Sequence, residues 1–182
     1  MPKSIFTALL ISLLVALLAL SPAPLSAQAS STRPNNNTPS GGSPLFSFAG
    51  KQPDNLGLNQ GKLAPCPDSP NCVSSQCATA DTEHSILAFT YQSEPLKAIE
   101  TLKSVLQSMP RTKLITENST YLYAEFATPL MGFVDDVEFY LDEADQVIHV
   151  RSASRLGESD LGVNRKRVEE IRAAFSDLDS AK

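Results

Sequence analysis

The sequence predicts an α+β fold, an antiparallel sheet of about five strands with two helices packed on one face, in the order β-α-β-β-β-β-α. Two patterns predict it. Segments with the composition of strands follow one another between polar turns, and two other segments repeat apolar residues at helical spacing. The length of 182 residues and the hydrophobic content of 42% fit one domain of this class rather than two.

The first helix is predicted between Ser93 and Pro110. Pro95 fits its first turn, where a missing N–H is tolerated, and Pro110 ends it. Apolar residues at helical spacing give this helix one buried face: Leu96, Ile99, Leu102, Val105, Leu106 and Met109. A strand is predicted just before the helix, over residues 85–92.

Four further strands and a closing helix follow. The strands are predicted over residues 112–117, 121–127, 133–141 and 146–152. Short polar turns join them, and strands joined in this way pair antiparallel. The closing helix carries Val168, Ile171 and Phe175 on one face, which we expect to pack on the sheet.

The last two strands allow a specific pairing to be predicted. A turn centred on Glu143-Ala144 sets apolar side chains against each other on one face and acidic against basic ones on the other. The predicted pairs are Phe139–Ile148, Val137–Val150, Glu138–His149 and Asp136–Arg151. A slip by one residue would destroy both matches. The face with the charged pairs is polar and can be open to solvent.

Residues 1–29 have the parts of a secretory signal. Lys3 precedes an uncharged apolar stretch over residues 5–20, and Ala27-Gln28-Ala29 is a small-residue exit. We expect cleavage after Ala29. The alternative is an uncleaved membrane anchor, because the apolar run approaches the length that spans a bilayer. No cysteine follows the run, so a lipoprotein attachment site is excluded.

The composition then changes to Ser, Asn, Pro and Gly. Residues 30–61 cannot bury enough apolar surface to offset the entropy of ordering them, so they are predicted to be a tether. Residues 62–182 remain as the single folded domain.

The domain is acidic as a whole and basic in one stretch. Residues 62–182 hold 12 basic and 19 acidic side chains, a net charge of −7, whereas residues 151–172 hold six basic and four acidic ones. A general nucleic-acid binder needs clustered positive charge to neutralise phosphates, so the acidic balance excludes that class. The basic stretch is where an anionic partner is expected.

That stretch continues into the last helix. If Asn164 caps this helix, Arg165, Lys166 and Arg167 occupy its first turn, where the helix dipole disfavours cations by about 0.3–1 kcal/mol each. A negative group should compensate, either a bound phosphate, sulfate or carboxylate or the protein's own carboxylates. If the helix begins at Ser159 instead, this argument weakens.

The two hypotheses, a bound anion and an internal ion-pair network, involve different residues. Candidates for contacting a bound anion are Arg151, Ser152, Ser154, Arg155, Asp160, Asn164, Arg165 and Arg167. Candidates for an internal ion-pair network are Asp135, Asp136, Glu138 and Asp160.

The carboxylates and histidines favour structural roles. Asp135 and Asp136 are adjacent in a strand and therefore point to opposite faces, so they cannot act together on one substrate. We expect Asp135, on the core side, to pair with Arg155, and His149 to pair with Glu138. No hydrolase, phosphate-loop or metalloprotease motif occurs, and no catalytic residue, metal or cofactor is assigned.

The three cysteines suggest one disulfide. Cys66 and Cys72 flank a turn rich in Pro and Asn, and in an oxidising compartment we expect them to pair, with Cys77 free or competing for a partner. Two alternatives involve His84, either as a fourth zinc ligand or as the base beside a cysteine nucleophile.

Three motifs also resemble the successive signatures of the domain-of-unknown-function family 1499. They are residues 66–75 (CPDSPNCVSS), 132–139 (GFVDDVEF) and 151–167 (RSASRLGESDLGVNRKR). The resemblance implies that the three motifs converge on one site, which adds Asn71 and Asp135 to the candidate ligand-binding residues. The family occurs in bacteria, including cyanobacteria, and in photosynthetic eukaryotes and has no assigned reaction. For an exported member it implies a periplasm or a thylakoid lumen.

The favoured function is a non-enzymatic exported binding or accessory protein whose Arg-rich loop engages an anionic small molecule or an acidic protein surface. One alternative is a small hydrolase or transferase that uses Ser, Asp and Arg of the same loop. Another is a structural subunit of a membrane-associated complex. The oligomeric state is not predicted.

Overall fold

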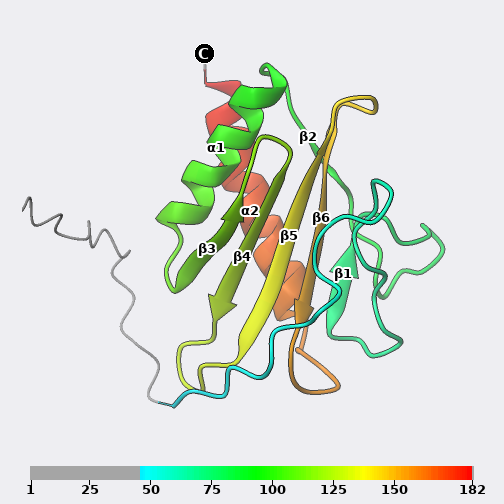
Figure 1. The fold of residues 1–182 in the computed structure, drawn as a ribbon, viewed down its shortest axis with the longest axis vertical. Helices are drawn as coiled ribbons and strands as arrows, with labels where there is room; N and C mark the ends of the chain where they lie inside the picture. Colours follow the sequence, from blue (N-terminus) through cyan, green and yellow to red (C-terminus); the bar gives the residue numbers. More distant parts are fainter. Residues whose placement is uncertain (1–45, 182) are drawn as a thin grey trace, which may run out of the picture. The chain divides into compact units, whose positions relative to one another are not determined.

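A computed structural model describes residues 46–181, which form one antiparallel sheet with both helices on one face (Figure 1). The elements are β1 (Cys72–Ser74), β2 (Phe89–Thr90), α1 (Pro95–Ser108), β3 (Thr112–Glu117), β4 (Tyr121–Ala127), β5 (Val134–Asp142), β6 (Val147–Ser154) and α2 (Val163–Ser180). The strand order is β1-β6-β5-β4-β3, with β2 also paired to β6. The α+β prediction is confirmed. The sixth strand, β1, was not predicted, because three residues in a cysteine loop carry no alternation.

The helix face of the sheet holds the main apolar core. Alternate residues of β4, β5 and β6 point to this face, as the period of two in a strand requires. They pack against the buried side of α1 and against Val168, Ile171 and Phe175 of α2. Phe89 lies between Phe139 and Phe175, with ring centroids 5.7 and 5.9 Å away. The predicted face of α2 is buried, and so is that of α1 except for Leu96 at its start, which is 63% exposed.

The pairing of β5 with β6 differs from the predicted register by two residues. Phe139 lies opposite Val150, and Glu138 lies opposite Arg151. The remaining corrected pairs are Val137–Ser152, Asp136–Ala153, Tyr140–His149 and Leu141–Ile148. A shift of two residues keeps every side chain on its predicted face, so the division into an apolar and a polar face holds.

The shift arises in the hairpin loop, which has four residues, Glu143–Gln146, instead of two. The Asp142 carboxylate accepts hydrogen bonds from the backbone N–H of Ala144 and Asp145 at 3.0 and 3.2 Å, and Gln146 has a φ of 54°. This local hydrogen bonding stabilises a longer turn than the sequence pattern suggested.

Of the predicted strand 85–92, Phe89–Thr90 pair with β6, and Ser85 forms a single parallel bridge with Ser74 of β1. The segment does not form a continuous strand because arginines of α2 bind its backbone carbonyl groups. Arg165 donates to the carbonyl of Ser85 at 2.9 Å, and Arg172 donates to that of Ala88 at 2.8 Å. A segment whose carbonyls bind arginines cannot use them in a strand ladder.

Residues 46–66, which we call the strap, cover part of the polar face, in front of the sheet in Figure 1. The Gly57 N–H donates to the Glu138 carboxylate at 2.7 Å, and Leu63 packs against Tyr121 and Tyr123. The expectation of an open polar face is therefore wrong, because part of the segment taken as a tether supplies apolar and backbone contacts to it.

The predicted signal peptide and the first part of the predicted tether, through residue 45, lie outside the described residues. Among residues 46–181 no helix is long and apolar enough to cross a membrane.

Candidate functional site

Several connections meet at one end of the sheet, the lower end in Figure 1, which we call the loop end. They are the α1–β3 turn (109–111), the β4–β5 loop (128–133), the β6–α2 loop (155–162) and the start of the strap (46–50). Backbone hydrogen bonds join them: Phe46 N–H to Leu130 O at 3.3 Å, and Arg155 N–H to Val134 O at 3.2 Å. The candidate residues of the basic stretch lie at or near this end.

On the helix face, the candidate residues surround Asn164. Its amide nitrogen donates to Asn71 O and to Ser154 Oγ, both at 3.0 Å. Its amide oxygen accepts from Ser152 Oγ and from Arg167, the latter at 2.9 Å. Asn164 is fully buried. Parts of the three motifs therefore meet at one buried amide, whose hydrogen-bonding groups are used within the protein.

The sequence analysis considered Asn164 as the cap of α2, but Asn164 lies inside the helix. The cap position is Gly162, in the left-handed region with a φ of 79°, and the helix begins at Val163. The Asp160 carboxylate accepts the N–H of Asn164 at 2.7 Å and of Gly162 at 2.9 Å. An anion at the helix N-terminus thus comes from the chain itself. The alternative start at Ser159 is also wrong.

Asp135 pairs with Arg167, and not with Arg155 as was predicted. The Arg167 guanidinium donates to the Asp135 carboxylate at 2.6 Å and lies over the Phe126 ring, 5.0 Å from its centroid. The Arg167 side chain is 10% exposed, so the pair lies at the edge of the core. This contact joins α2 to β5 on the helix face.

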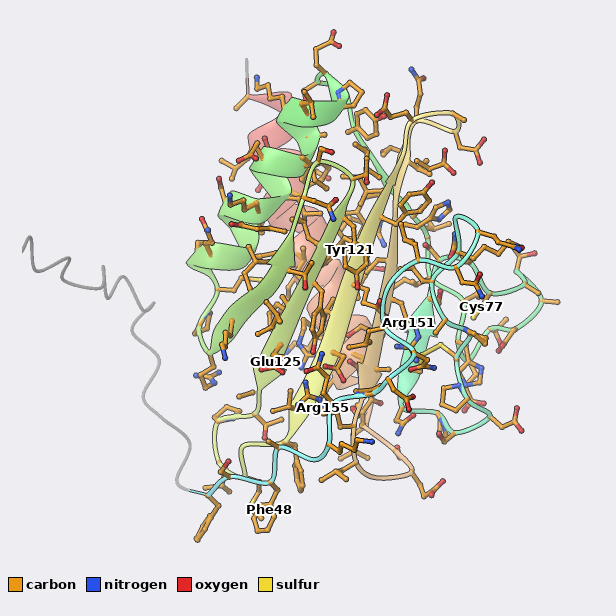
Figure 2. All side chains as sticks on the ribbon, viewed as in Figure 1. Phe48, Cys77, Tyr121, Glu125, Arg151 and Arg155 are labelled. Carbon is orange, nitrogen blue, oxygen red and sulfur yellow. A yellow bond between two sulfur atoms is a disulfide. The ribbon has the colours of Figure 1, made fainter. Side chains whose placement is uncertain are left out.

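Arg155 lies on the strap face and pairs with Asp136 (Figure 2). Its Nε and Nη2 donate to the Asp136 carboxylate at 3.0 and 2.7 Å, and Nη2 also donates to Glu125 and to Tyr123 Oη. The hydrogen bond with Asp136 and the contact with Glu125 raise the pKa of Arg155 against the effect of burial. Burial and the Asp136 carboxylate raise the pKa of Tyr123.

A second buried pair lies beside it under the strap. Arg151 Nη1 is 3.5 Å from the Glu138 carboxylate, which also accepts from Tyr121 Oη at 2.8 Å. Glu138 is completely buried, and within the described residues Arg151 Nε has no hydrogen-bond partner. Burial, and then the Glu138 carboxylate, raise the pKa of Tyr121.

The candidate arginines are therefore bound within the protein, as the hypothesis of an internal ion-pair network predicts. Arg151, Arg155 and Arg167 bind carboxylates, and Arg165 binds backbone carbonyls. The sequence analysis missed Arg111. It lines a hollow of about 300 Å³ at the loop end together with Lys166, Arg167 and one acidic residue, Glu170. Arg111 stands alone in the sequence, and only the turn from α1 into β3 brings it to α2, so no local signal could have found it.

The family model described as a protein of unknown function (DUF1499) matches residues 62–175. The chain belongs to the DUF1499 family. The match begins within the strap and includes the Cys loop, the sheet and most of α2. No curated protein matches the chain.

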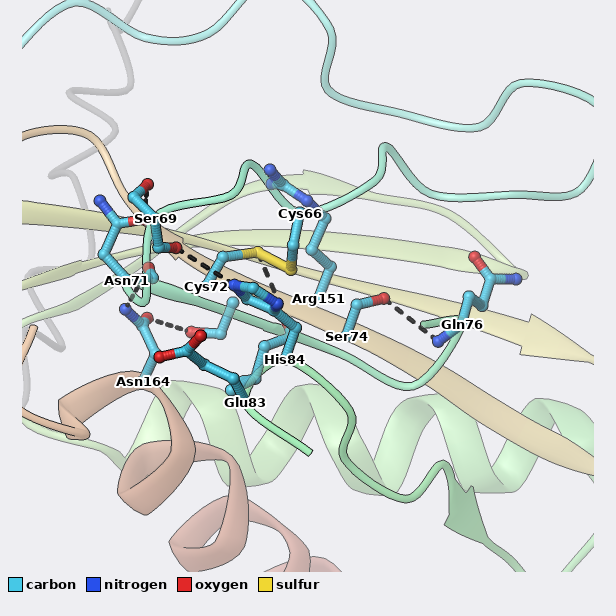
Figure 3. The surroundings of a disulfide bond; sticks show 12 residues. Cys66, Ser69, Asn71, Cys72, Ser74, Gln76, Glu83, His84, Arg151 and Asn164 are labelled. Atoms are coloured by element: carbon cyan, nitrogen blue, oxygen red, sulfur yellow. Dashed lines mark hydrogen bonds between the residues drawn. A yellow bond between two sulfur atoms is a disulfide. The ribbon is translucent and has the colours of Figure 1, made fainter. Parts of the chain in front are cut away.

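In this DUF1499 domain the predicted disulfide joins Cys66 to Cys72, with their Cα atoms 5.6 Å apart (Figure 3). Cys77 is a free, half-buried thiol. His84 Nδ1 lies 2.9 Å from the Asp81 carboxylate and Nε2 lies 3.3 Å from Ser69 O. The hydrogen bond with Asp81 raises the pKa of His84. With both ring nitrogens engaged, His84 is poorly placed as a zinc ligand or as a base for a cysteine.

His149 does not pair with Glu138. The two-residue shift of register places it beside Tyr140, with the rings stacked, and its Nδ1 lies 3.1 Å from Ser75 Oγ. Asp142 and Asp145 lie close enough to His149 for one atom of each to fall within 4.8 Å of the others. These groups belong to the opposite, hairpin end of the DUF1499 domain, away from the basic stretch.

Proposed function

We propose that this DUF1499 protein is an exported, non-catalytic binding protein that holds an anionic group in the hollow lined by Arg111, Lys166 and Arg167. One observation carries the proposal. Three cationic side chains and one carboxylate, that of Glu170, surround one hollow, on a domain whose net charge is −7. A phosphate, sulfate or carboxylate group matches the charge and the forked donors of the arginines.

Two of the three cations in this hollow, Arg111 and Lys166, have donors to spare, whereas Arg167 is engaged by Asp135 and Asn164. Within residues 46–181, Arg111 makes one side-chain hydrogen bond, from Nε to Ala127 O at 3.3 Å, so both terminal amino groups are free. Lys166 is 79% exposed and lies 3.8 Å from Glu170. Arg155 and Arg165 have their main donors engaged, and Arg151 is buried under the strap, 5% exposed. The anion-binding role expected of the basic stretch is thus better placed at its C-terminal part, together with Arg111.

The surroundings favour binding over catalysis. The hydroxyl groups of Ser152 and Ser154, in the basic stretch, are hydrogen-bonded to the Asn164 side chain. His84 and His149, the two histidines of the chain, contact Asp81 and Ser75 elsewhere. A hydrolase needs a nucleophile within reach of a base. The Ser, Asp and Arg of this stretch have no such base beside them among the described residues.

Titration with inorganic phosphate and sulfate, followed by NMR shifts or thermal melts, tests the proposal. At a hundred times its dissociation constant, phosphate should add about 2.7 kcal/mol of stability. The substitutions Arg111→Gln and Lys166→Gln should weaken binding. Lys97→Gln, at an exposed lysine in the first turn of α1, should leave it unchanged.

Asp135→Asn gives the complementary result, because it removes the carboxylate that holds Arg167. With Arg167 released, the affinity for phosphate should rise several-fold. If no anion binds, or if binding is the same in the Lys166 and Lys97 variants, the hollow is not an anion site and the proposal fails.

Export is supported by the sequence of residues 1–29 and points to a periplasm or a thylakoid lumen. The test is the intact mass of the protein purified from its own compartment. A mature chain beginning at Ser30 is expected, whereas a mass that includes residues 1–29 would mean that the apolar segment is kept as an anchor.

A further inference from the structure

We infer that the loop end is a docking surface for an anionic lipid bilayer, in which the anion held by the basic hollow is a lipid headgroup and neighbouring apolar side chains enter the membrane. The inference rests on the proposed function and extends it, because it names the class of ligand. It rests further on the distribution of exposed apolar residues, on the backbone at Leu161 and on the arrangement of two hollows.

Exposed apolar side chains gather at the loop end. Twelve large hydrophobic residues are exposed among the described residues, and seven of them lie here: Phe46, Phe48, Leu130, Phe133, Leu156, Leu161 and Val163. Five of them adjoin one another, and Phe46 and Leu130 are joined by a backbone hydrogen bond. The rings of Phe48 and Phe133 are 5.9 Å apart, and Phe133, Leu156, Leu161 and Val163 line one hollow. Single exposed apolar residues are ordinary, but a contiguous group marks a binding surface.

Leu161 is the most exposed member and is held outward by unusual backbone. Its side chain is 94% exposed, and its φ of 56° lies in the left-handed region, which is costly for a leucine. Gly162 follows with a φ of 79°. The turn at Leu161 lets the Asp160 carboxylate cap α2, but the leucine side chain itself gains no burial there. Strain of this kind is typical of functional loops.

The apolar hollow adjoins the basic one. It has a volume of about 380 Å³, and both hollows are lined by Thr128 and Val163. Its lining also includes two carboxylates, of which Asp135 is paired with Arg167 and Asp160 caps α2. A ligand that covers both must combine an anionic group with hydrocarbon. Anionic amphiphiles have this composition, and Arg111 and Lys166 add the positive charge that attracts anionic lipid surfaces.

A bilayer fits this surface better than a protein partner does. The apolar residues come from three separate loops and the start of α2, all at one end of the sheet (Figure 1), and Phe48 projects there in Figure 2. The chain also leaves the described part here, at Phe46. The apolar segment 5–20, which the sequence analysis assigns to membrane export or anchoring, lies upstream of this point.

Vesicle co-sedimentation tests the inference with the chain from Ser30 to Lys182, which lacks the N-terminal apolar segment. This chain keeps all of the described residues, 46–181. The vesicles contain phosphatidylcholine alone or with phosphatidylglycerol. We expect binding to the mixed vesicles and competition by inorganic phosphate. Lys166→Gln should lower the affinity about fivefold, the effect of one basic side chain near an anionic surface.

The deciding variant is Leu161→Asn, because asparagine tolerates the left-handed region. Its melting temperature should equal or exceed that of the unsubstituted chain, while its affinity for mixed vesicles should fall about tenfold or more, the effect of one apolar side chain leaving the membrane. Leu87→Asn is the matched control. Leu87 is 78% exposed and lies outside the loop end, so binding should persist.

The outcomes separate this inference from the proposed function. If phosphate binds but vesicles do not, the headgroup assignment is wrong and the anion site stands. If neither binds, both are wrong. Vesicle binding that survives Leu161→Asn overturns the docking surface. So does concentration-dependent dimerisation that Leu161→Asn abolishes, because the surface would then be a contact between two copies of the chain.

Discussion

Asp135 and Asp136 are neighbours in β5, are 2% and 1% exposed, and lie on opposite faces of the sheet. Asp135 faces the helices and binds one guanidinium, that of Arg167, which α2 supplies. Asp136 faces the strap and binds Arg155 through two donors, and it also accepts from Tyr123. Two identical side chains in equal burial therefore have different numbers of partners.

The difference extends to the two faces as a whole. The helix face is stabilised mainly by apolar packing, with its ion pair at the edge. The strap face holds charge in its interior, where Arg155 is 5% exposed and Glu138 is completely buried. Removing one member of a buried pair leaves an uncompensated charge, and that cost exceeds what the intact pair contributes. The strap face is consequently the one more sensitive to the loss of a single charged group.

Asp136→Ala should have the largest effect. It leaves the Arg155 guanidinium with Glu125 and Tyr123 in a site closed to water, so we expect a loss of about 3–5 kcal/mol in the free energy of unfolding. Urea unfolding followed by circular dichroism measures it. A double variant in which Asp136 and Arg155 are both replaced by apolar residues should recover part of the loss. A loss below that of Asp135→Ala would contradict the comparison.

Removing the disulfide should have the next largest effect. Cys66 is the last residue of the strap and Cys72 the first of β1, so the bond fixes the strap beside the sheet. For a loop this short, the loop-closure model gives about 2–3 kcal/mol. The double variant Cys66→Ser/Cys72→Ser should therefore unfold at lower urea. Cys77→Ser is the matched control and should change stability little. Equal losses in the two variants would mean that Cys77 takes part in the bond.

Asp135→Ala should cost less than either, about 1–2 kcal/mol, because Arg167 lies at the edge of the core and can turn toward water. The same urea experiment measures it. If Asp135→Ala instead equals Asp136→Ala, the number of partners does not determine the cost, and burial alone does.

The alternation of side chains correctly predicted which residues of β5 and β6 share a face. The register was wrong by two residues, and a shift of two leaves each side chain on the same face. The four-residue hairpin loop depends on hydrogen bonds to Asp142, which no pattern of apolar residues reports. One wrong partner could have been avoided. Arg155 is four residues from Arg151, so continued alternation places it on the face of Asp136 and not of Asp135.

The remaining elements could not have been found from local sequence. The strap is polar and rich in Pro and Gly, and it is ordered by contacts with Tyr121, Tyr123 and Glu138 that the chain reaches only after the sheet has formed. Arg111 and Lys166 are 55 positions apart and meet only in the fold. Lys166 belongs to the third motif, but Arg111 lies outside all three, so nothing in the sequence places the two side chains at one hollow.

The smallest effect is expected at the pair of Asp81, which is partly exposed, and His84, and it depends on pH. The hydrogen bond with Asp81 raises the pKa of His84 above its ordinary value of 6.5, against the effect of burial. The protonated histidine is thus favoured in the folded state. Its contribution to stability is fully present below about pH 6.5 and is lost as the pH rises through the raised pKa. The hydrogen bond with His84 lowers the pKa of Asp81, so its own contribution is lost only in acid.

Urea midpoints measured from about pH 5 to about pH 8.5 should fall across the upper part of that range, and His84→Gln should flatten the dependence. Because Asp81 is 41% exposed, solvent screens this pair, and the change should be smaller than the effect of either buried aspartate. If the pH-dependent change in stability is as large as the loss caused by Asp136→Ala, solvent exposure does not determine how much each aspartate contact contributes to stability. A flat profile in the unsubstituted chain would mean that the contact between Asp81 and His84 contributes nothing.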